Sequence, residues 1–255
     1  MKKPLIILTG PTAVGKTKLS ISLAKAVNGA IISADSMQVY RHMDIGSAKI
    51  RPEEMCGVPH YLIDVLDPSE EFHVVKFVEL AHEAMEKIYA AGQIPIVTGG
   101  TGFYIQALLK EVDFTESHGE LPIRKQLEEK AATEEGAAEL YRELSEVDPA
   151  SAETIHPNNV KRVIRALEYY HETGQKISEH NEEQKQKESP YCSAYFVLND
   201  ERSILYDRID RRVDQMIRDG LVEEVFRLKE MGYTRDLVSC LLYTSPSPRD
   251  ISGSR

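Results

Sequence analysis

The chain has 255 residues, of which 42% are hydrophobic and 28% charged, an ordinary composition for a soluble globular protein. This length supports one large domain, or one domain with an insertion, and the composition excludes a wholly disordered, collagen-like or membrane-spanning chain. The net charge of −10 excludes a globally basic nucleic-acid coat, although it leaves a local basic patch open.

The N-terminal part of the chain alternates short apolar runs with amphipathic segments. The runs are rich in isoleucine and bounded by Gly or Pro, as in buried parallel strands. The segments between them carry apolar residues at helical spacing and end at glycines. This alternation predicts an α/β fold, with a parallel sheet flanked by helices on both faces. We expect strands at 4–9, 30–34 and 94–98, and helices at 16–28, at 73–91 and through Ile105–Leu109.

The middle of the chain, residues 113–189, shows helical periodicity and no strand pattern. It carries 18 acidic and 10 basic side chains, a net charge of −8, against −1 for residues 1–112. This contrast predicts an inserted all-helical domain. We expect its helices at 121–132, 134–146 and 158–173. The polar stretch 176–190 is expected to be an exposed connection.

After the insertion the chain returns to the sheet. The apolar run 191–198 predicts a strand, and residues 200–230 predict a long helix that Asp219-Gly220 breaks or kinks. The α/β core is therefore expected to be discontinuous, comprising residues 1–112 and 190–239. Residues 240–255 have no periodicity, and their composition predicts a disordered tail.

A phosphate-loop motif, GPTAVGKT, lies between the first expected strand and the first helix. It matches G-x-x-x-x-G-K-[ST], in which backbone N–H groups at a helix start cradle a diphosphate. Lys16 supplies a mobile charge, and the Thr17 hydroxyl binds Mg²⁺. The motif does not distinguish ATP, GTP or a prenyl diphosphate. The expected diphosphate-binding residues are Gly10, Pro11, Thr12, Ala13, Val14, Gly15, Lys16 and Thr17.

Two further segments follow strands and should lie beside this loop, because ligands bind at the carboxyl ends of parallel strands. Asp35 follows the second strand, where a carboxylate can accept a proton from a nucleophile, cap a helix or support Mg²⁺. The stretch 98–102 follows the third strand. Its glycines permit close backbone approach to a ligand, and the Thr101 hydroxyl can bond a substrate, unless the segment is only a turn.

Basic side chains gather at two other places. Lys161, Arg162 and Arg165 lie off the buried stripe of a helix, where they suit phosphate contacts. Ion pairs with Glu168 or Glu172 are the commoner alternative. On the last long helix an arginine can neutralise a leaving diphosphate, and periodicity does not choose among the candidates. These are Arg208, Arg211 and Arg212.

The cysteines indicate the compartment. They are three in number, far apart and without CxxC spacing, which argues against a disulfide framework or a zinc ribbon and fits a reducing cytosol. The N-terminal apolar run is too short for a signal peptide. We therefore expect a cytoplasmic protein with no membrane partner.

Several long motifs occur in fixed order and together carry a resemblance. They are GPTAVGKT, ADSMQVYRHMDIGSAK (34–49), GVPHYLIDVLDP (57–68), GGTGFYIQALL (99–109), NVKRVIRALE (159–168), ERSILYDRIDRRVDQM (201–216) and GLVEEV (220–225). From about residue 4 to residue 239 the chain resembles the tRNA dimethylallyltransferase family of bacterial type, also called tRNA isopentenyltransferases or IPP transferases.

The resemblance implies a P-loop core with a tRNA-binding helical insertion, and a reaction. A dimethylallyl group passes from dimethylallyl diphosphate to the exocyclic amine of the adenosine 3′ of the anticodon, with Mg²⁺ as cofactor. The tRNA anticodon stem-loop is the partner, and we expect a monomer. The implied catalytic residues are Asp35 as general base, Thr101, and Arg208 over the diphosphate. The implied tRNA contacts are Asp35, Ser36, Met37, Gln38, Thr101, Arg124, Lys161, Arg162 and Arg165.

The sequence departs from the family pattern after Ser239, where residues 240–255 do not resemble the expected continuation. This departure puts tRNA affinity in question, but it does not touch the phosphate loop, Asp35, Thr101 or Arg208. Two other functions share the strand–loop–helix signature. One is a small-molecule or nucleoside kinase, which would transfer the γ-phosphate of ATP. The other is a nucleotide-dependent RNA-binding switch, which would turn over no substrate.

Overall fold

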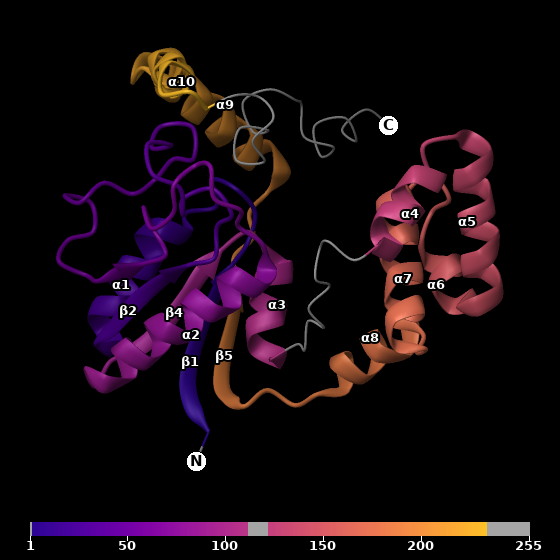
Figure 1. Cartoon of the computed structure of the whole chain (residues 1–255). Helices are drawn as coiled ribbons and strands as arrows, with labels where there is room; N and C mark the ends of the chain where they lie inside the picture. Colours follow the sequence, from indigo (N-terminus) through magenta and orange to yellow (C-terminus); the bar gives the residue numbers. More distant parts are fainter. Residues whose placement is uncertain (1, 112–121, 234–255) are drawn as a thin grey trace. The chain divides into compact units, whose positions relative to one another are not determined.

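The structure, a computed structural model, describes residues 2–111 and 122–233 (Figure 1). The chain divides into two compact units, one comprising Met1–Glu111 with Ser189–Arg255 and the other Val112–Glu188. Each unit has its own hydrophobic core. The tail expected at 240–255 lies outside the described residues.

The first unit is built on a five-stranded parallel sheet with the order β3-β2-β4-β1-β5. The predicted parallel sheet with flanking helices is thus confirmed. The sheet also contains the two-residue strand β3, which the sequence does not predict because so short a strand has no periodicity to recognise. The strands are β1 (Lys3–Thr9), β2 (Gly29–Ser33), β3 (His60–Tyr61), β4 (Ile94–Gly99) and β5 (Tyr191–Val197).

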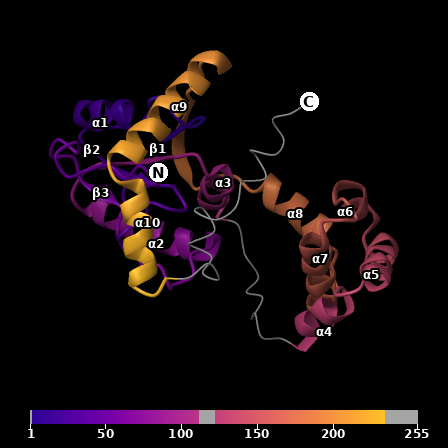
Figure 2. The same ribbon diagram turned by 90° about the horizontal axis from the view of Figure 1, so that it is seen from above.

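Helices cover both faces of this sheet. Successive side chains of a strand point to opposite faces, so the apolar strands present side chains on both faces for helices to bury. On β1, Leu5 and Ile7 pack with α2 (Val74–Ala90) and α3 (Gly102–Lys110). The intervening Ile6 packs with the residues of α1 (Lys16–Val27) on the other face. Figure 2 shows this layering, with α1 on one side of the strands and α2 and α3 on the other.

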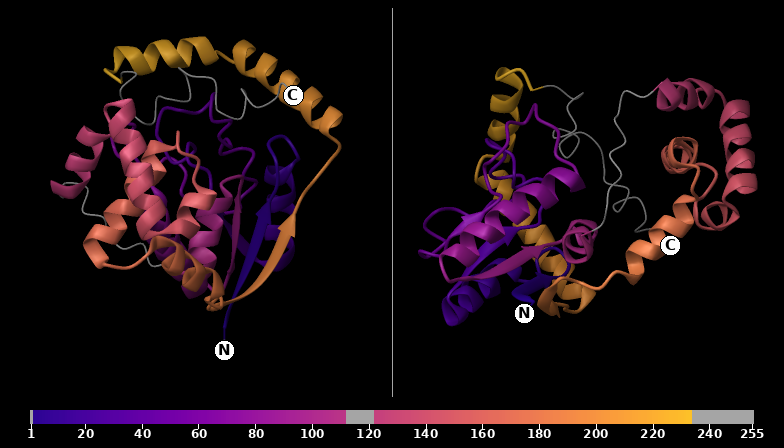
Figure 3. Two further views of the ribbon diagram at one scale, coloured as in Figure 1. Left: turned by 90° about the vertical axis from the view of Figure 1, so that its right-hand side faces the viewer. Right: turned by 60° about the horizontal axis from the view of Figure 1, so that its bottom comes forward.

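Two helices after β5 complete the first unit. They are α9 (Arg202–Arg218) and α10 (Leu221–Glu230), and the break between them falls at Asp219-Gly220 as predicted. Both helices lie across the carboxyl ends of the strands (Figure 3, left). Leu228 of α10 packs with Val39, Tyr40 and Met43 of the long β2–β3 connection. Helices α9 and α10 therefore cover the edge of the sheet where a site is expected.

The second unit is all helical and holds a core of leucines and small residues. Its buried Asp148 accepts hydrogen bonds from the backbone N–H and the hydroxyl of both Ser151 and Ser178. Burial raises the pKa of Asp148, but these hydrogen bonds outweigh it and hold the pKa below its ordinary value. The helices are α4 (Pro122–Lys130), α5 (Glu134–Val147), α6 (Pro149–Thr154), α7 (Val160–Thr173) and α8 (Ile177–Gln186).

The expectation that residues 176–190 form a connection is wrong for most of its length, because α8 occupies Ile177–Gln186. Its first turn is held by contacts remote in sequence. Ile177 packs against the core of the unit, and Ser178 is bound to Asp148. A polar segment thus becomes helical through one anchored end, which local periodicity does not show.

Candidate active site

The phosphate loop, residues 10–17, connects β1 to α1 at the carboxyl edge of the sheet. Both of its glycines have backbone conformations that other residues rarely adopt, with φ of +148° at Gly10 and +97° at Gly15. A Cβ at Gly10 would also collide with the backbone oxygen of Leu198. The N–H groups of the first turn of α1 have no intrahelical acceptor, and no side chain caps them. The loop therefore presents backbone donors at the positive end of a helix.

Lys16 lies over this loop, and the charges of Asp35 and Arg212 both act on it. Its ammonium group donates hydrogen bonds to the backbone oxygens of Gly10 (2.8 Å) and Pro11 (2.7 Å). Burial lowers the pKa of Lys16, the carboxylate of Asp35 opposes this shift, and the charge of Arg212 adds to it. Lys16, Asp35 and Arg212 therefore share one electrostatic site.

Asp35 follows β2 and faces this site. Its Oδ1 accepts the backbone N–H groups of Met37 (2.9 Å) and Gln38 (3.4 Å), which fixes a tight turn and the direction of the carboxylate. Among the described residues no donor is bonded to Oδ2. Oδ1 thus fixes the orientation of the carboxylate, and Oδ2 can accept a proton from a substrate.

The end of β4 lies between the ends of β1 and β2, because β4 is the strand between them in the sheet. Thr9 donates a hydrogen bond from its hydroxyl to the Gly99 oxygen (2.9 Å). On the other side, a Cβ at Gly99 would collide with the backbone of Ala34. Thr101 then precedes α3, and its hydroxyl makes no capping hydrogen bond. The loop, Asp35 and Thr101 follow three adjacent strands.

The arginines of α9 differ in their surroundings. Arg208 forms an ion pair with Asp200 (2.8 Å), and exposed Arg211 lies 3.8 Å from Asp207. Arg212 is half-buried; burial lowers its pKa, and Asp35 opposes that shift. The charge of Asp35 therefore acts on Arg212, whereas Arg208 is paired with Asp200.

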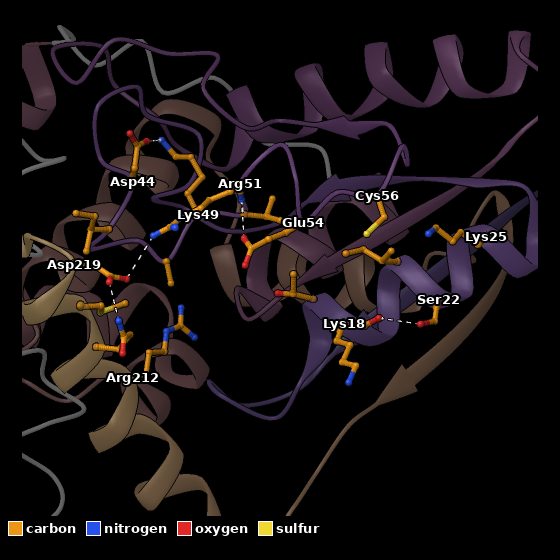
Figure 4. Close-up of a pocket in the computed structure, with 17 residues that line it drawn as sticks. Lys18, Ser22, Lys25, Asp44, Lys49, Arg51, Glu54, Cys56, Arg212 and Asp219 are labelled. Carbon is orange, nitrogen blue, oxygen red and sulfur yellow. Dashed lines mark hydrogen bonds and ion pairs between the residues drawn. The ribbon is translucent and has the colours of Figure 1, made fainter.

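A cavity of about 870 Å³ adjoins the phosphate loop (Figure 4). One wall is α1 from Thr17 onward, the second is the segment 44–56, and the third is α9 with Arg212. Apolar side chains from each wall, including Ile21, Ile45 and Met216, share the lining with charged groups. Such a cavity suits a ligand with an anionic end and an apolar end.

Mg²⁺ was expected at Thr17. Thr17 lines the cavity, and its hydroxyl makes no hydrogen bond within residues 2–111 and 122–233. The same residues contain no cluster of three His, Cys, Asp or Glu side chains suited to a metal. A hydroxyl beside a diphosphate cradle fits Mg²⁺, which binds through one or two protein oxygens and completes its shell with phosphate and water.

Comparison with known proteins decides the family. Residues 38–245 match the family model described as IPP transferase. A tRNA dimethylallyltransferase of Lachnoclostridium phytofermentans is 65% identical over 237 residues, which span 93% of this chain and 75% of that protein. The chain belongs to the IPP transferase family. A tRNA dimethylallyltransferase of Bacillus mycoides is 50% identical over 231 residues, 91% of this chain and 72% of that protein.

Solved structures agree with this membership in the IPP transferase family. The tRNA isopentenylpyrophosphate transferase of Bacillus halodurans is 45% identical with a TM-score of 0.66, over 94% of this chain and 74% of that one. A eukaryotic dimethylallyltransferase studied while acting on tRNA is 39% identical with a TM-score of 0.79, over 90% and 56%. The family inferred from the sequence motifs and its α/β fold are thereby confirmed.

Besides Asp35 and Thr101, the residues expected to touch tRNA in the first unit of this IPP transferase lie just after Asp35. Ser36 and Met37 are half-buried, and Met37 packs against the cluster beneath α10. Gln38 accepts a hydrogen bond from the Ser33 hydroxyl and donates its amide to the oxygens of Ser47 (3.3 Å) and Ala48 (3.4 Å). Gln38 therefore braces the turn that holds Asp35.

In the second unit the expected tRNA-contacting cations have two kinds of surroundings. Arg124 and Arg165 both contact the fully buried carboxylate of Glu168, at 3.4 and 3.1 Å. Arg165 thus forms the ion pair with Glu168 that was the alternative to a phosphate contact, and its contact with tRNA stays a prediction. Lys161 and Arg162 are exposed at the start of α7, where the described residues supply them no ion pair. Two of the cations are held in place, and two extend into solvent.

Across the parts of the IPP transferase chain that the structure describes, no helix is long and apolar enough to cross a membrane.

Proposed function

We propose that this IPP transferase transfers the dimethylallyl group of dimethylallyl diphosphate to the exocyclic amine of the adenosine 3′ of the anticodon in tRNA, releasing diphosphate. Dimethylallyl transfer to tRNA is the activity named for relatives that match nine-tenths of the chain. The observation that carries the assignment to specific residues is that the phosphate loop, Asp35 and Thr101 follow three adjacent strands, with Arg212 and Thr17 lining one cavity. The charges of Lys16, Asp35 and Arg212 also act on one another.

The diphosphate end of the donor binds the phosphate loop. The first-turn N–H groups of α1 and the Lys16 ammonium contact its oxygens, and Arg212 approaches from α9. When the bond between the allylic carbon and the diphosphate oxygen breaks, its electron pair stays on the diphosphate. Fixed positive groups stabilise that developing charge without reorganisation.

Asp35 handles the proton. The lone pair of the adenosine amine forms the new bond to the allylic carbon, and the amine proton passes to the Asp35 carboxylate. The turn through Met37 and Gln38 fixes that carboxylate, so that its second oxygen can meet the amine. Thr101 follows the neighbouring strand and can bond the same base.

Thr17 would hold Mg²⁺ together with the diphosphate oxygens. When bound, Mg²⁺ neutralises charge on the leaving diphosphate. The rest of the reaction uses groups of the chain itself, with the apolar residues of the cavity surrounding the prenyl group.

The target adenosine must leave its stack before its amine can react. Single-stranded anticodon loops permit this, and Lys161 and Arg162 supply exposed positive charge for the RNA backbone. The segment 36–38 lies beside Asp35, where it can contact neighbouring nucleotides. We propose that the enzyme acts as a cytoplasmic monomer with the second unit binding tRNA.

Asp35→Asn provides the sharpest test of the chemistry. An asparagine retains an oxygen that can accept the turn hydrogen bonds, but it cannot take the proton. Transfer of labelled dimethylallyl groups to unmodified tRNA should fall by about 10²–10⁴-fold, while dimethylallyl diphosphate still binds. Near-normal turnover would remove Asp35 from the role of base.

A parallel reaction with ATP separates the alternatives. Label incorporated into tRNA without ATP supports prenyl transfer. ATP consumption without prenylation would replace this proposal with a kinase. Salt-sensitive RNA binding without any turnover would replace it with an RNA-binding switch.

A further inference from the structure

One buried carboxylate of the first unit belongs to no part of the mechanism described so far. Glu224 of α10 is 2% exposed. It accepts three consecutive backbone N–H groups, with Oε2 bonded to Asp44 (2.9 Å) and Ile45 (2.7 Å), and Oε1 bonded to Gly46 (3.0 Å). Burying a carboxylate is costly unless charged hydrogen bonds compensate, and these three donors do so.

The backbone that Glu224 holds is a wall of the cavity beside the phosphate loop. Asp44 and Ile45 line this cavity, and α9 lines it from another side with Arg212. Gly220, at the joint between α9 and α10, lies close to Ile45. Glu224 is one turn beyond that joint, so its hydrogen bonds connect the helix pair that carries Arg212 to the facing wall.

The same wall is linked to the proposed base. The oxygens of Ser47 and Ala48, directly after the held segment, accept the side-chain amide of Gln38. The Gln38 backbone N–H in turn donates to Asp35 Oδ1 (3.4 Å). A shift of residues 44–48 therefore reaches Asp35 through two successive hydrogen bonds.

An independent anchor keeps this loop folded without Glu224. The Lys49 ammonium is buried and contacts the carboxylates of Asp44 (2.6 Å) and Asp64 (2.5 Å), and it donates to the Tyr40 oxygen (2.7 Å). Changing Glu224 should therefore loosen Ile45 and Gly46, while Lys49 still holds Asp44 and the base of the loop.

We propose that Glu224 is a positioning residue for prenyl transfer, whose carboxylate fixes the 44–46 wall of the donor cavity and, through Gln38, the direction of Asp35. This inference rests on the proposed function for its substrate. It assigns to α10 a role in shaping the site, although no atom of Glu224 lines the cavity.

Three variants test the proposal, namely Glu224→Gln, Glu224→Asp and, as a matched control, the same Gln change at exposed Glu223 on the same helix. The glutamine keeps the volume of the side chain but offers one acceptor oxygen and an amide that opposes the N–H groups. The KM for dimethylallyl diphosphate should rise about tenfold or more, with a smaller fall in kcat. Asp, which keeps both acceptors on a shorter stem, should recover part of the loss.

The readouts are steady-state prenyl transfer, affinity for inorganic diphosphate and thermal melting, with kinetics measured well below the lowest midpoint. If Glu224→Gln and Glu223→Gln have the same KM, the proposal is overturned, even if one of them melts earlier. That result leaves the proposed function intact, because the wild-type enzyme would still transfer the prenyl group. A wild-type enzyme that transfers none would overturn the function itself.

Discussion

Replacing Arg212 with alanine should slow prenyl transfer far more than the same change at Arg208 or Arg211. Arg212 is half-buried beside the loop, and its charge lowers the pKa of Lys16. Arg208 is already engaged by Asp200 at 2.8 Å, and Arg211 is exposed. The three arginines lie within two turns of one helix, so the three alanine variants differ only in which position of α9 is changed.

The size of the effect follows from the charge that moves. A guanidinium about 4 Å from a full negative charge contributes about 4 kcal/mol at an effective dielectric constant of about 20. If about half of the charge has developed on the diphosphate at the transition state, Arg212 lowers the barrier by about 2 kcal/mol, or about thirtyfold in rate. Complete charge development raises the factor to about 10³, so the expected loss in kcat lies between these values. Arg211→Ala should change kcat by less than about threefold.

Single-turnover transfer from labelled dimethylallyl diphosphate, with enzyme in excess over tRNA, measures the chemical step directly. The single-turnover rate of Arg212→Lys should lie between those of the wild type and Arg212→Ala, because lysine keeps the charge but lacks the planar guanidinium group. If Arg208→Ala slows the step as much as Arg212→Ala or more, the charge-based reasoning is refuted, and Arg208 is the arginine over the diphosphate.

Two further predictions concern stability. Gly99→Ala should lower the folding free energy by about 2–3 kcal/mol and remove most of the activity, because the new Cβ would collide with Ala34. Gly100→Ala is the control, since its Cβ has its nearest neighbour at 4.0 Å. In thermal melts it should be close to neutral. Asp148→Asn should destabilise the helical unit by about 2–3 kcal/mol at pH 7 in urea titrations. The pKa of Asp148 is lowered in the folded state, so the stabilisation it provides is lost as the pH falls through that pKa. The unfolding free energies of the wild type and Asp148→Asn should therefore become equal in acid. A difference that does not change with pH would contradict this.

Much of the site could be predicted because it depends on strand ends. The phosphate loop, Asp35 and Thr101 each follow a strand, and the carboxyl ends of adjacent parallel strands meet at one edge. The loop sequence also fixes its own geometry, since Gly10 and Gly15 adopt positive φ angles. These features rest on local sequence and on a general rule of topology.

What the sequence did not reveal depends on contacts remote in sequence. Arg208 and Arg212 are one turn apart, so periodicity gives them the same face; the ion pair with Asp200 separates them. The helix at Ile177–Gln186 is polar, and it depends on Ser178 meeting Asp148 across the unit. Glu224 belongs to a charged segment whose pattern does not distinguish it from Glu223, and its hydrogen-bond partners lie in the β2–β3 connection.

The position of β5 has a consequence for synthesis on the ribosome. β1 pairs along one edge with β4 and along the other with β5, which follows the whole of Val112–Glu188. At about 5–20 residues per second, making that segment takes on the order of ten seconds. During this interval one edge of β1 has unpaired N–H and C=O groups, open to pairing with another chain. The insertion has its own core and can fold in the meantime, so β1 gains its second partner strand only after the helical unit has been made.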